Sequence, residues 1–244
     1  EIPLRLVGSE MCIRDRTITS NLEEKIMYDY VEERKNGELS LRAYNLTIGL
    51  VLLWGFVVNV LMCKFCTKTF MSWNFTAVVI GYFIVAIAGM LISRFSDNPF
   101  ISFIGYNMVV LPVGVVLSIA LTEYDKISIM NALLTTTVVT LIMIILATAI
   151  PNIFLSMGKV LFVCLTGVVV CELIFMFIGF ATPSLWDFIV ALIFCGYIGY
   201  DWAEAQTKER TLDNAVDSVV DLYLDIVNLF LRILSSSSKS SKND

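Results

Sequence analysis

Residues 211–234, TLDNAVDSVVDLYLDIVNLFLRIL, form a segment long enough to cross a membrane that also carries a row of acidic side chains. On a helix with about 100° between successive residues, its polar positions fall within an arc of about 120°. These positions are Asp213, Asp217, Asp221, Asp225, Asn228 and Arg232. Most of the remaining surface is apolar, so the segment predicts a helix with one lipid-compatible face and one polar face.

The rest of the chain is strongly apolar. Of its 244 residues, 57% are hydrophobic and 16% are charged, and the mean hydropathy is +0.80, whereas a soluble domain is about 25% charged. Backbone groups in lipid must bond internally, so each long apolar segment should be helical. The expected fold is an all-α membrane protein with seven transmembrane helices, at approximately residues 43–62, 73–93, 99–121, 127–150, 154–180, 185–202 and 215–234.

Composition also excludes several classes of function. The chain has no histidine, which removes zincin chemistry, Ser-His hydrolysis and any imidazole-based pH switch. The net charge is −5 without a large basic block, so a nucleic-acid partner is not expected. Cys63 and Cys66 form CKFC, but no second pair completes a zinc site. We expect no resident cofactor, and any proton sensing must use carboxylates.

Asp225 is the most informative of the acidic residues, because it lies about midway along the last segment. A charged aspartate at the centre of a membrane helix costs roughly 2.5–3.5 kcal/mol, so it should face a protein or water interior. Two alternatives are a helix lying on the membrane surface and a solvated first turn. A helix on the membrane surface normally carries basic residues, whereas this one is acidic. A solvated first turn explains Asp213 but not Asp225, which lies near the middle of the segment.

A partner for Asp225 is available at the end of the sixth segment, FCGYIGYDWAEAQ at residues 194–206, which contains Asp201. If the last two helices form a hairpin, the two carboxyl groups can approach. Two ionised carboxylates about 4 Å apart repel by roughly 4 kcal/mol at an effective dielectric of 20, enough to hold one shared proton. Protonated, the pair can latch two helices; deprotonated, it can receive a cation, and oxygen ligands suit calcium.

Other polar residues in the apolar segments could support this ion gate. Glu172, in VVCELIF at residues 169–175, is expected to have a functional or packing-network role. Arg94, at the end of the second segment, is either a counter-charge for the latch or an end residue that extends to the interface. The candidate pore-lining or supporting residues are Asp217, Asp221, Asn228, Glu172, Tyr197 and Arg94.

GYIGYDWAEAQ at residues 196–206, followed by the segment at residues 211–234, resembles the signature of the Bax inhibitor-one family, the transmembrane Bax-inhibitor-motif proteins. FIGYNMVVLPVGVVLS at residues 103–118 resembles bacterial members of that family. The resemblance implies that six helices enclose the acidic seventh. It also implies a pH-dependent calcium leak sensed by Asp201 and Asp225, with an arginine latch nearby.

Two other functions are alternatives to an ion leak. Intramembrane aspartyl proteases also use two aspartates, but they carry Gly-x-Gly-Asp and Pro-Ala-Leu motifs that are absent here, so we do not expect an enzyme. A non-conducting membrane protein that modulates stress or cell death through protein partners remains open. Replacing Asp201 and Asp225 by asparagine distinguishes the two functions. A scaffold should tolerate the change, whereas a proton-gated leak should lose its pH dependence.

The sequence also predicts how the chain is organised. Residues 1–16, which include LVGSEMCIRDR, look like a translated sequencing adaptor; residues 17–40 form a charged amino-terminal segment. Residues 41–234 form the seven-helix domain, and residues 235–244 a serine-rich tail. Lys and Arg are slightly more numerous on the amino-terminal side of the predicted spans. This bias favours a cytosolic amino terminus, in what we expect to be a bacterial cytoplasmic membrane.

Overall fold

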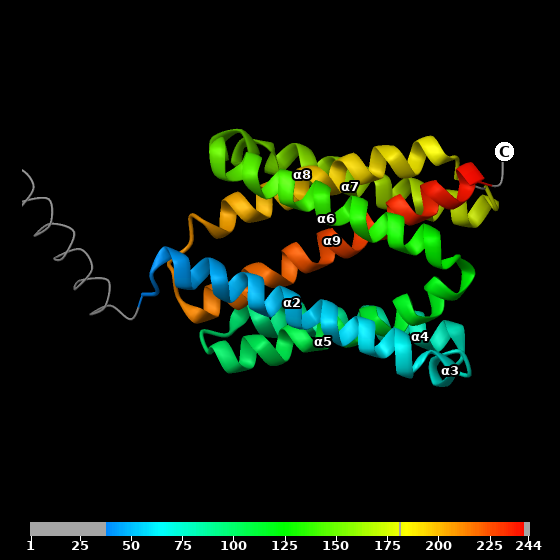
Figure 1. Ribbon diagram of the computed structural model, residues 1–244, viewed down its shortest axis with the longest axis horizontal. Helices are drawn as coiled ribbons and strands as arrows, with labels where there is room; N and C mark the ends of the chain where they lie inside the picture. The colour runs from blue at the N-terminus through cyan, green and yellow to red at the C-terminus, as the bar shows by residue number, and fades with distance from the viewer. Residues whose placement is uncertain (1–37, 181, 242–244) are drawn as a thin grey trace, which may run out of the picture.

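The computed structural model describes residues 38–180 and 182–241, so the predicted adaptor and nearly all of the predicted charged segment lie outside the described residues (Figure 1). The described part of the chain contains eight α-helices and one 3-10 turn, and no strand. In chain order they are α2 (Leu41–Phe65), α3 (Thr67–Phe70), α4 (Phe75–Phe95), α5 (Pro99–Ala120), η1 (Leu121–Glu123), α6 (Lys126–Ala149), α7 (Pro151–Ile178), α8 (Ser184–Ala205) and α9 (Leu212–Ser241).

Six of the described helices are long and apolar enough to cross a membrane, namely α2, α4, α5 with η1, α6, α7 and α8. The first six predicted segments are therefore confirmed as helices, and their ends differ from the prediction by only a few residues. Helix α9 is less apolar because of its aspartates, and it is not among these six. It also continues through the serine run to Ser241, beyond the predicted end at Leu234, since no proline or glycine interrupts it.

Five of the described helices begin where a polar side chain caps the first turn. These caps are Ser40 before α2, Asn74 before α4, Asn98 before α5, Asp125 before α6 and Thr211 before α9. Each accepts a hydrogen bond from a backbone N–H that has no partner within the helix. At Asp125, hydrogen bonds from the side chain and the backbone of Ser128 lower the pKa of this exposed carboxyl.

Helix α9 lies in the middle of the molecule, between α2 and α5 on one side and α6 and α8 on the other (Figure 1). Tyr223 fixes its central turns: it is fully buried, accepts a hydrogen bond from the Asn59 side chain of α2 and packs edge-on against Tyr106 of α5. By contrast, α2, α4, α6 and α7 expose many large apolar side chains on their outer faces. This is the distribution expected when the surroundings of the bundle are lipid.

Helices α4 and α5 approach closely at two glycines. A Cβ atom at Gly89 would overlap the carbonyl oxygen of Gly105 and the side chain of Met108. A Cβ atom at Gly105 would overlap the carbonyl oxygen of Gly89 and the backbone of Ser93. Small residues permit such contacts between membrane helices, and this contact brings Ser93 and its neighbour Arg94 toward α9.

We expect Gly89→Ala to lower the free energy of unfolding by about 1–3 kcal/mol, because the added methyl group forces the two backbones apart. Gly81→Ala is the matched control on the same helix, since nothing lies within 4 Å of a Cβ atom there. The control should be neutral or stabilising by up to about 1 kcal/mol, owing to the better helix propensity of alanine. Thermal unfolding in detergent measures both; equal shifts of Tm would contradict the close-packing argument.

Candidate functional site

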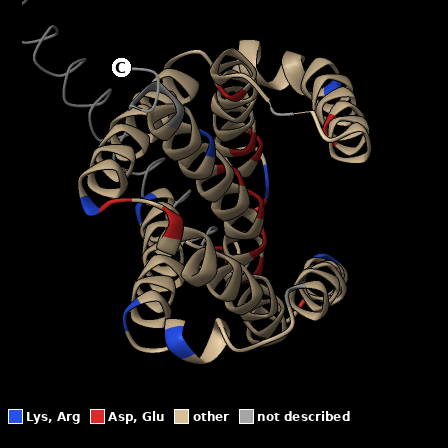
Figure 2. Cartoon of the chain, turned by 90° about the vertical axis from the view of Figure 1, so that its right-hand side faces the viewer, with Lys and Arg blue, Asp and Glu red and all other residues tan. Residues whose placement is uncertain are grey.

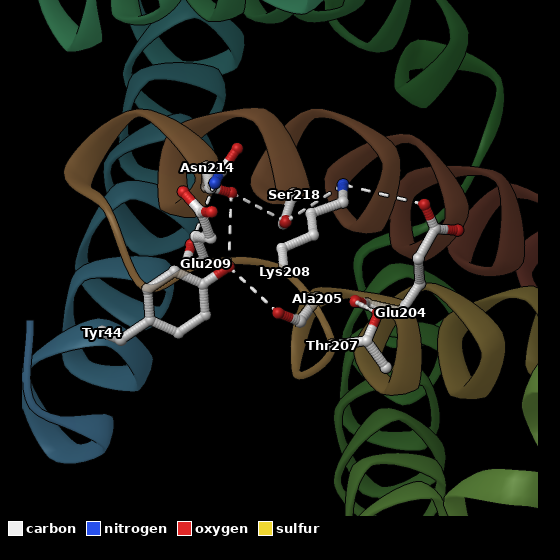
Figure 3. Close-up of polar contacts among 8 residues, drawn as sticks. All are labelled: Tyr44, Glu204, Ala205, Thr207, Lys208, Glu209, Asn214 and Ser218. Atoms are coloured by element: carbon white, nitrogen blue, oxygen red, sulfur yellow. Dashed lines mark hydrogen bonds and ion pairs between the residues drawn. The ribbon is translucent and has the colours of Figure 1, made fainter. Parts of the chain in front are cut away.

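The connection between α8 and α9 is fastened to the first turn of α2. The hydroxyl group of Tyr44, which is fully buried, donates to the carbonyl oxygens of Ala205 at 3.1 Å and Asn214 at 3.4 Å (Figure 3). The backbone N–H of Leu39 donates to the carbonyl oxygen of Arg210 at 2.7 Å. These contacts hold the end of α8 beside the start of α9, and so set the register between the two helices.

Lys208 joins the same two helix ends through its ammonium group. Its Nζ lies 3.8 Å from Glu204 Oε1 on α8 and donates to Ser218 Oγ on α9 at 3.4 Å (Figure 3). Ser218 Oγ in turn donates to the carbonyl oxygen of Asn214 at 2.8 Å. The polar residues around this turn therefore form one connected network, which positions the acidic face of α9 against α8.

With this register, the structure brings Asp201 of α8 and Asp225 of α9 together. Their carboxyl groups lie in hydrogen-bonding contact with each other. Asp225 is only 8% exposed, and no N–H or O–H group of the described chain donates to its Oδ2. Two carboxyl groups can hydrogen bond only when one of them carries a proton. The arrangement therefore suits a pair that shares one proton.

Tyr197 and Asn228 flank the pair along the two helices. Tyr197, one turn before Asp201, lies within electrostatic range of both carboxyl groups. Asn228 is half-buried three residues beyond Asp225, and its side chain forms no hydrogen bond within residues 38–180 and 182–241. Tyr197 is therefore placed where it can respond directly to the charge of the pair.

A cavity of about 410 Å³ opens between α4, α8 and the first turns of α9. Its polar lining residues are Ser93, Arg94, Glu204, Lys208, Asn214, Asp217 and Asp221. Arg94 and Lys208 lie within electrostatic range of Asp221, which in turn acts on Asp201. Arg94 therefore lines this cavity and interacts with Asp221, and Asp221 in turn interacts with Asp201 of the aspartate pair.

The two aspartates nearest the start of α9 are bound by serines that sequence reasoning missed. Ser93 of α4 donates to Asp217, and Ser102 of α5 donates to Asp213 Oδ1 at 2.7 Å. Asp213, which was expected to be a solvated first-turn residue, thus has a partner on a neighbouring helix. Serines in apolar helices are common packing residues, so the sequence offered no signal that these two face the acidic helix.

Glu172 belongs to a second polar cluster, toward the other end of α9. Its Oε1 lies 2.5 Å from Arg232 Nη2 and accepts a hydrogen bond from Trp186 Nε1 at 3.2 Å. Arg232 Nη1 also lies 3.4 Å from Asp187 Oδ1, and Ser235 Oγ donates to Asp187 Oδ2 at 3.0 Å. This cluster ties α7, α8 and α9 together. Asp187 was not among the residues predicted to support the site.

Charge is unevenly distributed over the bundle. Figure 2 shows that the acidic positions run mostly along the middle of the bundle. The polar face of α9 thus has two separate regions. At the start of the helix, Asp217 and Asp221 line the cavity and Asp213 is bound by Ser102 of α5. Arg232 anchors the far end. Asp225 lies between them, in contact with Asp201.

Comparison with known proteins identifies the family. A family model described as "Inhibitor of apoptosis-promoting Bax1" matches residues 38–242. An uncharacterised protein of Helicobacter pylori (strain J99) is 32% identical over 156 residues, which cover 62% of this chain and 66% of that protein.

Two relatives from eukaryotes carry family names. The BI1-like protein of Arabidopsis thaliana is 42% identical, with 33% of this chain and 32% of that protein covered. Bax inhibitor 1 of Schizosaccharomyces pombe is 35% identical, with 37% and 35% covered. The chain thus spans about a third to two thirds of the length of these relatives. Because the family match extends over all seven predicted spans, the chain is an integral membrane protein that belongs to the Bax inhibitor-one family and has bacterial relatives.

Proposed function

We propose that the protein is a pH-sensitive calcium leak channel of the Bax inhibitor-one type, gated by the proton that Asp201 and Asp225 share. In this proposal α9 is the seventh transmembrane helix and is enclosed by the other six. One observation carries it. Two carboxyl groups are in contact inside the bundle, and Oδ2 of Asp225 receives no hydrogen bond from the described chain.

The gate works through the interaction between the two carboxyl groups. While they share a proton, their hydrogen bond holds α8 against α9 and closes the path. When the proton leaves, two like charges about 4 Å apart repel by roughly 4 kcal/mol at an effective dielectric of 20. This repulsion favours separation of the helices and leaves two carboxylates that can receive a calcium ion in passing. Calcium is the permeant ion here, and no resident cofactor takes part.

The cavity beside the pair supports a cation path. Asp217 and Asp221 line it and attract cations, while Arg94 offsets part of their charge in the closed state. The cavity lies at the end of the bundle where α2 and α9 begin and α8 ends (Figure 1). With the amino terminus in the cytosol of a bacterial cell, the cavity would open toward the cytosol.

Calcium efflux from proteoliposomes between pH 6 and 8 tests the proposal. The wild-type flux should rise with pH, by at most about tenfold per pH unit if one proton controls the gate. Asp201→Asn and Asp225→Asn should each remove most of this dependence, because an amide has no proton to lose in this range. Asp125→Asn is the matched control; this aspartate is exposed at the start of α6, and asparagine can still cap the helix.

Two outcomes would count against the leak. Flux that is absent at every pH, with folded protein in the vesicles, would favour the non-conducting interaction protein. Flux whose pH dependence survives in both aspartate variants would show that a different group senses protons.

A further inference from the structure

Two adjoining cavities lie toward the carboxyl end of α2. The first, of about 540 Å³, is lined by Cys63, Lys64, Phe65, Thr67, Lys68, Ser118, Leu121 and Thr122. The second, also of about 540 Å³, has a mostly apolar lining. The two share Cys63, Lys64 and Leu121 as lining residues, so they form one continuous depression with a polar and an apolar half.

The polar half carries unpaired positive charge at the end of two membrane spans. Lys64 is in the last turn of α2 and Lys68 is in the short helix α3. Both side chains are exposed, and neither forms an ion pair with any residue that the structure describes. Span ends lie at the level of the lipid headgroups, and lysines there attract anionic lipid.

The apolar half lies between α2 and α6, with α9 as its floor. From Phe56 to Lys64 it extends over nine helical residues, or about 12 Å along the helix axis. Val60 and Leu133, on its two walls, are 62% and 44% exposed, so the groove is open to the surroundings of the bundle. Its floor includes Ile226 and Phe230, whose side chains are nearly buried.

We propose that this depression binds one anionic phospholipid, with the phosphate against Lys64 and Lys68 and an acyl chain in the groove between α2 and α6. The charge and the shape together select this ligand. A zwitterionic headgroup would place its own cation near two lysines, and a free anion would leave the apolar half unfilled. The bilayer supplies a molecule that satisfies both halves at once.

The α9 residues at the floor of the groove connect the proposed lipid site to the acidic helix. Ile226 follows Asp225 directly on α9, and Phe230 lies about one turn further on. An acyl chain in the groove therefore packs against the turn of α9 that carries Asp225, one member of the aspartate pair. Lipid binding itself does not depend on the proposed leak, so either can fail while the other holds.

Lipid retention tests the site. The protein is reconstituted in vesicles of equal phosphatidylcholine and phosphatidylglycerol, extracted in mild detergent, and its bound lipid is quantified by mass spectrometry. Wild type should be enriched in phosphatidylglycerol. In the double variant Lys64→Gln/Lys68→Gln, this enrichment should fall by a factor of about five for each lysine removed. Arg42→Gln/Lys159→Gln removes two exposed positive charges elsewhere and should retain wild-type enrichment.

The apolar half is tested separately by filling the groove. Val60→Trp should displace the acyl chain and reduce retention of phosphatidylglycerol, whereas Val57→Trp, on an exposed part of α2 that does not line the groove, should not. The proposal is overturned if wild type retains both lipids equally or if the lysine variant keeps its enrichment. Full retention by Val60→Trp would also overturn it, because the groove would then hold no acyl chain.

Discussion

Arg232→Gln is expected to lower the free energy of unfolding by about 2 kcal/mol. The guanidinium group bridges Glu172 on α7 and Asp187 on α8, and Asp187 is 1% exposed. Removing one partner of a buried ion pair costs about 3–5 kcal/mol, whereas an exposed pair contributes at most about 1 kcal/mol. Arg232 is partly exposed, so an intermediate value is expected.

A double-mutant cycle with Asp187→Asn isolates the charge interaction. In the Asp187→Asn background, Arg232→Gln should cost less, since Asp187 then carries no charge that needs compensation. Unfolding in a denaturing detergent mixture measures all four proteins, and Arg42→Gln is the control for loss of an exposed arginine. An identical cost in both backgrounds would mean that the pair with Asp187 contributes nothing, and that Arg232 stabilises the bundle through Glu172 or through packing.

The positions of the apolar helices could be predicted because hydropathy is a local property. Each span needs a run of apolar residues, and proline, asparagine and charge mark the connections, as at Asn98 and Pro99 before α5. The end of α9 was predicted less well, because a serine run contains no residue that stops a helix. The contact between Asp201 and Asp225 also followed from short-range information, since adjacent helices joined by a short turn must pack side by side.

Contacts between helices distant in the chain could not be predicted in this way. Asp187 lies in the first turn of α8, where an acidic residue is expected to be solvated, and only the packing of α9 places Arg232 against it. Likewise, Ser93 looked like an ordinary end-of-span residue until α4 was seen to lie beside Asp217. An arc of polar residues identifies the face of a helix, but not the partner of each residue on that face.

The second large effect concerns the pH dependence of stability. If Asp201 and Asp225 share a proton in the folded protein, the folded state binds more protons near neutral pH than the unfolded chain. Ordinary aspartates in that chain are ionised above about pH 5. By linkage, the free energy of unfolding must then fall as pH rises, by at most about 1.4 kcal/mol per pH unit. Between pH 6 and 8 we expect a loss of about 2 kcal/mol in the wild type.

Asp225→Asn should remove this part of the slope, because the amide neither shares a proton with Asp201 nor carries a charge that repels it. The quantity to compare is the slope of the free energy of unfolding against pH in wild type and variant, because other carboxylates contribute equally to both slopes. Parallel slopes would show that the pair holds no proton near neutral pH, and a proton-controlled gate would then lack its sensor. A steep wild-type slope together with absent calcium flux would have a different meaning. The aspartates would latch α8 to α9 under the control of pH, and the latch would serve an interaction with another protein instead of an ion path.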